Sequence, residues 1–179
     1  MKKFLVILLI AVVSVGTSFS QNSIAHIDSQ KILDTMPSRK AAMKEVENFE
    51  RKALQELQET QKDLQAAFDR FQRERSTMSK TAAQFQEERL NKQAQEFQQR
   101  QQELDQQIQI LSQELNRPIL ARLQKAVDIV SKAEKLNYVL DASSLLYSNG
   151  NDITKKVIVE VLKLEQEAAA SSKAEGEGE

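Results

Sequence analysis

The stretch from Pro37 to Leu136 constrains this chain more than any other part of it. Its 100 residues contain no glycine and one internal proline, Pro118, which is expected to kink or restart a helix there. They are mostly Gln, Glu, Lys, Arg, Ala and Leu, residues that lose little free energy on entering a helix. Apolar residues recur at alternating steps of three and four, a 3.5-residue period that is typical of coiled coils. The stretch is therefore predicted to be helical.

Two apolar seams run along this stretch, and they do not share a heptad frame. The first seam ends at Met78 and the second begins at Ala83. One continuous helix would rotate the second seam away from its partner. Residues 76–81 carry four hydroxyl side chains, which favour helix caps, and Thr81 with Gln84 fits a capping box. The pattern predicts an antiparallel hairpin with its turn at Met78, in either of two registers, with arms roughly 60 Å long.

The first twenty residues have the features of a secretory signal peptide. A basic start is followed by a twelve-residue apolar run from Phe4 to Val15, and Ser18 and Ser20 supply small residues before a cleavage site. The run is too short for a mature membrane anchor, and no Cys follows it that would make a lipoprotein. Export with cleavage after Ser20 is expected, and an uncleaved membrane helix is the alternative.

Composition excludes several kinds of function. Removing two Lys with the signal peptide moves the net charge from −1 to −3, which argues against nucleic-acid binding through bulk charge. One His and no Cys exclude metal clusters and Cys/His dyads, and His26 is interpreted as a structural residue of a short strand. Gly150 is the one glycine between the signal peptide and the C-terminal tail, so no glycine-rich phosphate loop is present. We predict no enzymatic activity and no cofactor.

The residues that flank the long stretch predict a small body of mixed secondary structure. Strands are expected at residues 23–28, 138–140 and 145–147, and Asp152 is a suitable N-cap for a final helix. Asp28 is a suitable N-cap for a short helical turn before the long stretch. Three short strands leave open edges, and so small a body buries little of its own surface. Partner chains are therefore expected to join it.

In this interpretation the chain is mainly α-helical, with a long antiparallel hairpin arm on a small α+β body through which copies associate. Residues 1–20 are the signal peptide, 37–118 the arm, 21–36 with 119–166 the body, and 167–179 an acidic disordered tail. Apolar residues of the body are expected to form the shared core of the oligomer: Ile24, Ile27, Val139, Leu140, Leu145, Leu146, Ile153, Val157 and Val161.

The closing segment of the body is the most specific part of the sequence. Residues 137–162 read NYVLDASSLLYSNGNDITKKVIVEVL, and they follow an IAHID strand and the Gln-rich hairpin. With the signal peptide, this order of segments resembles the Skp/OmpH family of periplasmic holdase chaperones. The resemblance implies a homotrimer with a β-barrel-like body made from all three chains and three arms enclosing a cavity. It also implies a periplasmic location, and unfolded outer-membrane β-barrel proteins as partners held without ATP.

The charge of the arm departs from the pattern of that family. Its members are basic, with positively charged arms that attract acidic partners and lipopolysaccharide. Here residues 37–136 contain 18 Lys and Arg against 16 Asp and Glu. Contact with a membrane or with lipopolysaccharide therefore cannot be carried over to particular residues. The positive excess lies near the expected turn and is a second candidate client contact: Arg70, Arg73, Arg75 and Lys80.

Apolar residues outside the seam are the first candidates for contact with an unfolded client. Phe49, Leu54, Phe68 and Phe85 lie off the a and d positions, in an arm with 17 Gln between residues 55 and 113. They either thicken the core of the hairpin or present small apolar patches for many weak contacts. A structural coiled-coil protein of the envelope, or an adaptor for one folded partner, is the alternative function.

Overall fold

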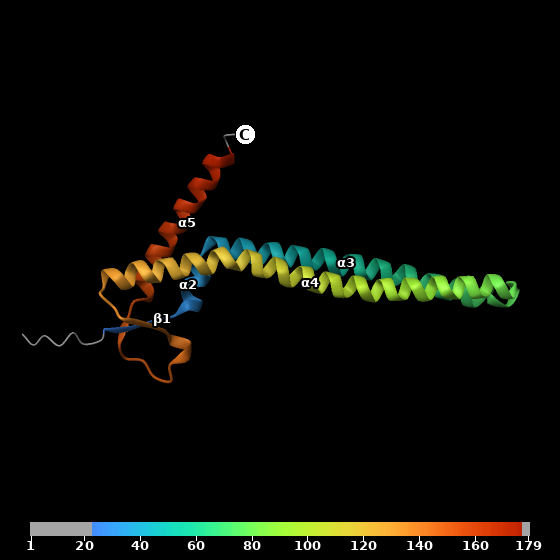
Figure 1. Ribbon diagram of the computed structural model, residues 1–179, viewed down its shortest axis with the longest axis horizontal. Coiled ribbons are helices and arrows are strands. Elements are labelled where there is room, and N and C mark those ends of the chain that lie inside the picture. The colour runs from blue at the N-terminus through green and yellow to red at the C-terminus, as the bar shows by residue number, and fades with distance from the viewer. Residues whose placement is uncertain (1–22, 177–179) are drawn as a thin grey trace, which may run out of the picture.

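Two long helices dominate the computed structural model, which describes residues 23–176. The signal peptide expected at residues 1–20 lies outside the described residues. Helix α3 (Pro37–Glu74) and helix α4 (Lys80–Ala133) lie side by side, and the short 3-10 helix η1 (Arg75–Thr77) joins them at the far end (Figure 1). None of the described helices is long and apolar enough to cross a membrane.

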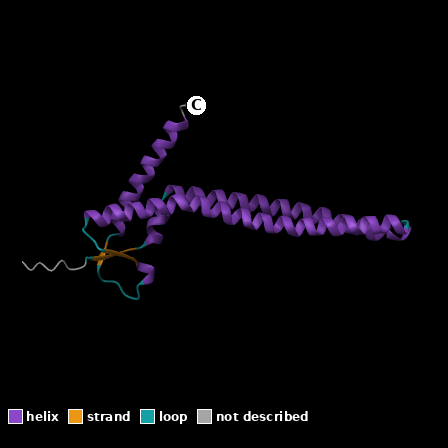
Figure 2. Cartoon of the chain, viewed as in Figure 1, coloured by secondary structure: helices purple, strands orange, loops and turns teal. Residues whose placement is uncertain are grey.

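The remaining elements gather at the other end of the long helices, where Figure 2 shows a small sheet. Its three strands are parallel, in the order β2-β1-β3. Two further helices and a 3-10 turn pack around them or extend from them. The bounds are β1 (Ile24–Ile27), α2 (Ser29–Thr35), β2 (Tyr138–Asp141), the 3-10 helix η2 (Ala142–Ser144), β3 (Asn151–Asp152) and α5 (Thr154–Gly176). The chain is therefore mainly helical with a small sheet, as predicted.

The long helices begin where local chemistry favours a start. Pro37 is the first residue of α3, a position at which its missing N–H is not needed. Ser79 precedes α4 with an extended backbone, and its Oγ accepts a hydrogen bond from the Ala82 N–H at 3.3 Å. The capping box predicted at Thr81 was therefore wrong by two residues. Thr81 already lies inside the helix, because Ser79 caps it first.

Helix α4 runs through Pro118 without ending, so the predicted restart was wrong. The proline removes one N–H, and the carbonyl that loses this donor belongs to Glu114, which is exposed to solvent together with Pro118. Packing holds the helix together on its other side, where Ile119 is 2% exposed against the body. The helix ends at Ala133. Two residues later, Lys135 has a left-handed φ of 55°, and the Leu136 N–H donates to the Ser131 carbonyl at 2.9 Å.

The third strand lies later in the sequence than predicted. Strands at β1 and β2 match the expectation, with Ile24 opposite Tyr138 and His26 opposite Leu140. The run at residues 145–147 is not a strand. Strand β3 pairs with β1 instead, through Asp152 opposite His26. The helical turn η2 directs the chain away from the sheet before residue 145, and only after Gly150 does it return.

An aspartate at the end of each strand, or directly after it, accepts a hydrogen bond from the start of the next helical turn. Asp28 accepts a hydrogen bond from the Lys31 N–H at 2.9 Å, which confirms it as the N-cap of α2. Asp141 accepts from the Ser143 N–H at 2.8 Å, and Asp152 accepts from the Thr154 N–H at 2.9 Å. Asp152 was predicted to be the N-cap of α5. It lies within β3, and because α5 begins at Thr154, it stands one position before the N-cap. Hydrogen bonds lower the pKa of all three carboxyl groups: the Lys31 N–H does so for Asp28, and the side chains of Ser143 and Thr154, followed by backbone N–H groups, do so for Asp141 and Asp152.

The core of the body is formed within one chain, where α5 packs against α2, α4 and β1. Ile153, Val157 and Val161 of α5 are 0% exposed, and Ile27 is 7% exposed. Beyond this core α5 continues as a helix to Gly176, so residues 167–176 are helical where a disordered tail was predicted. The reason lies in their composition, since Ala, Glu and Lys are good helix formers.

Candidate interaction surfaces

The arm, meaning α3, η1 and the part of α4 that lies beside α3, has a thin apolar core. Only Ala53, Leu90 and Leu104 are nearly fully buried along most of its length, and most of the other apolar seam residues are half-buried. Polar contacts between the helices supplement this core. The Arg100 guanidinium binds the Glu56 carboxylate at 2.6 Å, which lowers the pKa of Glu56. Because only two helices pack together, many apolar side chains of the arm stay partly exposed, where a partner can contact them.

The four apolar candidates of the arm divide into two exposed and two half-buried residues. Leu54 is 56% exposed and Phe85 is 66% exposed, so both present apolar surface to solvent. Phe49 and Phe68 are half-buried against the arm. Phe49 and Phe68 therefore pack against the hairpin, whereas Leu54 and Phe85 lie on its surface, where contact with a client stays a prediction.

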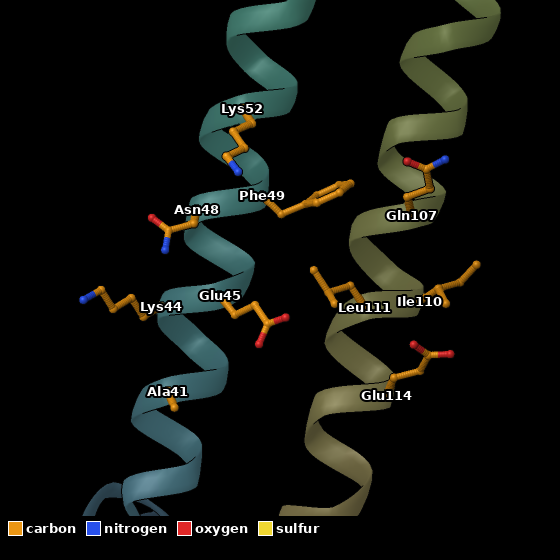
Figure 3. A pocket seen from close by; sticks show the side chains of 10 residues that line it. All are labelled: Ala41, Lys44, Glu45, Asn48, Phe49, Lys52, Gln107, Ile110, Leu111 and Glu114. Atoms are coloured by element: carbon orange, nitrogen blue, oxygen red, sulfur yellow. The ribbon is translucent and has the colours of Figure 1, made fainter. Parts of the chain in front are cut away.

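A hollow of about 710 Å³ lies beside Phe49, near the body end of the arm. Figure 3 shows the ring of Phe49 pointing from α3 toward α4, and Leu111 of α4 pointing back toward α3. Ile110 lines the same hollow and is 54% exposed. Sequence reasoning missed Ile110, which lies outside the seam, directly before the seam position Leu111. Two consecutive apolar residues at one turn were the signal that could have found it.

The basic residues at the tip are exposed, but carboxylates lie among them. Arg75 lies 3.7 Å from Glu87 and its guanidinium stands 5.7 Å from the centre of the Phe71 ring. Arg70 and Glu74 line the same hollow. Arg73 and Lys80 are likewise exposed. The tip is therefore a mixed surface of both charges with apolar residues between them.

One face of the sheet is apolar and uncovered within the chain. Side chains alternate along the strands, so that Ala25 and Val139 face the helices while Ile24, Tyr138 and Leu140 face outward. The outward residues are 53%, 58% and 41% exposed, respectively. In the loop between η2 and β3, Leu146 is fully exposed and Leu145 is half-buried. His26, half-buried, lies on the same face of β1 as Ile24.

A carboxylate holds α5 against the start of the arm. Glu165 is 9% exposed and accepts hydrogen bonds from the Ser38 N–H at 2.9 Å, the Ser38 hydroxyl at 2.8 Å and the Arg122 guanidinium at 2.8 Å. Ser38 belongs to α3 and Arg122 to α4, so one side chain joins three helices. Sequence reasoning missed this contact, although Glu165 continues the four-residue spacing of the buried positions of α5.

Within residues 23–176, no group of three or more His, Cys, Asp or Glu side chains is arranged to hold a metal ion. The polar side chains described above are engaged in caps, ion pairs and helix contacts. What the surfaces offer is binding area: exposed apolar residues on a polar arm, and an apolar sheet face on the body.

Comparison with a solved structure gives the class of fold. A crystal structure of an OmpH-like outer membrane chaperone from Caulobacter crescentus CB15 matches with a TM-score of 0.69. The match covers 82% of this chain and 88% of that chain at 18% sequence identity, so it concerns the fold. The chain therefore has the fold of an OmpH-like protein.

Sequence comparison gives the family. The model of the family described as outer membrane protein (OmpH-like) matches residues 23–161, and the chain belongs to this family. Among its relatives is the chaperone protein Skp of Photorhabdus laumondii, 30% identical over 150 residues, which are 83% of this chain and 90% of that protein. Skp of Yersinia pestis is 34% identical over 141 residues, 78% of this chain and 86% of that protein. The resemblance noted from the closing segment is confirmed.

Proposed function

We propose that this chain is a periplasmic holdase chaperone that binds unfolded outer-membrane β-barrel proteins and prevents their aggregation without ATP. The observation that carries the proposal is the surface of the arm, where isolated apolar residues stand in polar surroundings. Such a surface offers many weak contacts, whereas one continuous apolar groove would bind its client too tightly to release it. Unfolded barrel strands alternate apolar and polar residues and so expose matching small patches.

The same proposal includes a homotrimer joined through the body. The support is the uncovered sheet face, since exposed apolar patches of this kind mark sites of association. Ile24, Tyr138, Leu140 and Leu146 would be shared between chains. Ile27, Ile153, Val157 and Val161 would support them from inside each chain, where they are already buried. The membership of the family, and the names of the Skp relatives, favour a chaperone over a structural rod or an adaptor for one folded partner.

Aggregation of a client tests the function. A urea-denatured outer-membrane β-barrel protein is diluted into buffer, and light scattering is followed with and without this protein. We expect suppression by the wild type and weaker suppression by Leu54→Gln with Phe85→Gln, which removes exposed apolar surface without opening the core. Val159→Gln is the matched control, because Val159 is 70% exposed but lies on α5. Equal suppression by the wild type and the double variant would move the client contact elsewhere, with the tip as the next candidate.

Shortening of the arm tests the oligomer separately. Residues 50–107 are replaced by a short glycine-rich turn, and the mass in solution is measured by light scattering. Association through the body predicts a trimer for both the full chain and the shortened chain. A monomer after shortening would mean that the arms hold the assembly.

A further inference from the structure

The loop between η2 and β3 contains the dipeptide Asn149-Gly150, to which the fold gives no part. Asn-Gly is typical of a two-residue turn between antiparallel strands. Here β3, which follows the dipeptide, pairs with β1 in parallel, so the dipeptide forms no hairpin. Residues 145–150 belong to no helix or strand, and the loop extends away from the helices (Figure 2). Both residues of the dipeptide are exposed, so their own chemistry is unobstructed.

The backbone nitrogen of Gly150 can approach the side-chain amide of Asn149. Gly150 has no side chain beside this nitrogen, and its backbone rotates more freely than that of any other residue. Within residues 23–176, no hydrogen bond engages the Gly150 N–H or the Asn149 side chain. The attacking nitrogen and the carbon it would attack are therefore both free.

The other asparagines of residues 23–176 are held differently. None of them precedes a glycine, so a side chain always lies beside the next nitrogen. In α3 and α4 the N–H of the next residue already donates to a carbonyl one turn earlier. The Tyr138 N–H, after Asn137, donates to the Ser23 carbonyl at 3.4 Å. Among the described residues, Asn149 alone is followed by a nitrogen that is both unbonded and unhindered. The other asparagines are Asn48, Asn91, Asn116, Asn137 and Asn151.

We propose that Asn149 is a site of self-modification by deamidation. The deprotonated nitrogen of Gly150 attacks Cγ of Asn149 and forms a C–N bond. The bond from Cγ to Nδ2 breaks, and the side-chain nitrogen leaves as ammonia with the proton that the Gly150 amide lost. The cyclic imide that results takes up a water molecule and opens at either of its carbonyl carbons. The products are aspartate, or isoaspartate in which the backbone runs through Cγ, and no group is oxidised or reduced.

The modification lies where it can disturb the body. Strand β3 begins directly after Gly150 and has only two residues. Its Asp152 lies opposite His26 of β1, and the Asp152 carboxylate accepts from the Thr154 N–H at the start of α5. Both products add a negative charge before this strand, and isoaspartate also lengthens the backbone there by a carbon atom. The isoaspartate form should therefore lose the pairing of β3 with β1, and the chain should lose stability with age, whatever its function.

Mass spectrometry of peptides from the incubated full chain measures the reaction. The protein is kept in warm, mildly alkaline buffer, and isoaspartate is detected with protein isoaspartyl methyltransferase and a labelled methyl donor. We expect conversion at residue 149 at least tenfold faster than at any other asparagine of residues 23–176. The rate should rise with pH, because the deprotonated nitrogen attacks.

A synthetic peptide of residues 145–154 is the unfolded reference for this rate. Because the loop leaves both groups free, conversion in the protein should lie within tenfold of conversion in the peptide. An intact Asn149 in the protein beside a converted peptide would show that the folded loop, or a second chain that covers it, keeps the site closed. That result would overturn the proposal.

Gly150→Ala tests the part played by the glycine. Gly150 has no left-handed φ, and a methyl group there would meet no atom within 4 Å beyond its chain neighbours, so the variant should fold unchanged. The methyl group hinders the nitrogen, and we expect conversion to slow at least tenfold. Ser148→Ala is the matched control, because Ser148 is exposed on the other side of Asn149 and should not alter the rate. Equal rates in the wild type and Gly150→Ala would contradict the mechanism.

Urea unfolding of fresh and aged protein tests the consequence for β3. The urea midpoint of the wild type should fall on ageing, and that of Gly150→Ala, aged for the same time, should not. Fresh Asn149→Asp carries the charge without the added backbone carbon and should stay close to the fresh wild type. An unchanged midpoint in fully converted wild type would show that β3 tolerates isoaspartate. A fall in fresh Asn149→Asp as large as that of the aged wild type would assign the loss to charge, and either result overturns the expected effect of isoaspartate.

Discussion

Removing the carboxylate of Glu165 should destabilise the protein more than any other single change at a charged residue of the body. The side chain accepts three hydrogen bonds, all between 2.8 and 2.9 Å, and is 9% exposed. In Glu165→Ala the Ser38 N–H and hydroxyl lose their acceptor, and the Arg122 guanidinium loses its partner.

The size of the effect follows from this geometry. Breaking a buried ion pair from one side costs about 3–5 kcal/mol. The side chain of Arg122 is 28% exposed, so water recovers part of the loss and the lower end of that range applies. We expect Glu165→Ala to lower the free energy of unfolding by about 3 kcal/mol. Glu165→Gln, which keeps one acceptor oxygen, should cost about 1–2 kcal/mol.

Urea unfolding, followed by helical circular dichroism at a fixed chain concentration, measures both values. Glu167→Ala is the control, because Glu167 is exposed on the same helix and should change stability by less than about 0.5 kcal/mol. The double variant with Arg122→Ala should cost less than the sum of the two single changes, because the residues are in contact. If Glu165→Ala is no worse than Glu167→Ala, the contact that joins the three helices contributes nothing to stability, and the reasoning fails.

Three further predictions concern export, acid and association. Intact-mass analysis of protein purified from the cell envelope should give a chain that starts at Gln21; recovery of the full-length chain from the cytoplasm would contradict export. The pKa values of Asp141 and Asp152 lie below the ordinary 3.8, so the stability they add is present above the unfolded-state pKa and is lost as pH falls through their folded pKa. The urea concentration at the midpoint of unfolding should therefore fall when the pH is lowered below about 4. The fall should be smaller in Asp152→Asn, because its side chain keeps an acceptor but does not titrate. An equal fall in that variant would show that Asp152 does not contribute to the pH dependence of stability. Leu140→Lys should reduce the mass in solution by placing a charge on the uncovered sheet face, and an unchanged oligomer would locate the interface elsewhere.

Periodic and local signals were the parts of the sequence that could be read correctly. The long helices follow from apolar spacing and the absence of glycine, and the cap at Asp28 follows from its side-chain chemistry. Errors arose where tertiary context decided the outcome. Pro118 did not end its helix, because packing around Ile119 holds both sides of it in place. The apolar run at residues 145–147 did not become a strand, because the turn η2 carries it away from the sheet.

The candidate surfaces were less predictable than the fold for a related reason. Off-seam position left open whether Phe85 and Leu54 are exposed. It did not distinguish them from Phe49 and Phe68, whose exposure depends on how closely the two helices approach. Ile110 was missed because a heptad pattern assigns one face at a time. Glu165 was missed because a lone carboxylate on a helix has no sequence signal for its partners, which come from residues 43 and 127 positions away.

The parallel pairing of β1 with β2 has a consequence for the order of folding. Ile24 and Tyr138 are neighbours in the sheet, yet the whole arm separates them along the chain. Closing so long a loop in a flexible chain costs about 4 kcal/mol of entropy, whereas contacts between α3 and α4 near their turn are local and form quickly. Zipping of the helices from the turn brings the two strands together step by step. The arm therefore serves during folding as the template on which the sheet assembles.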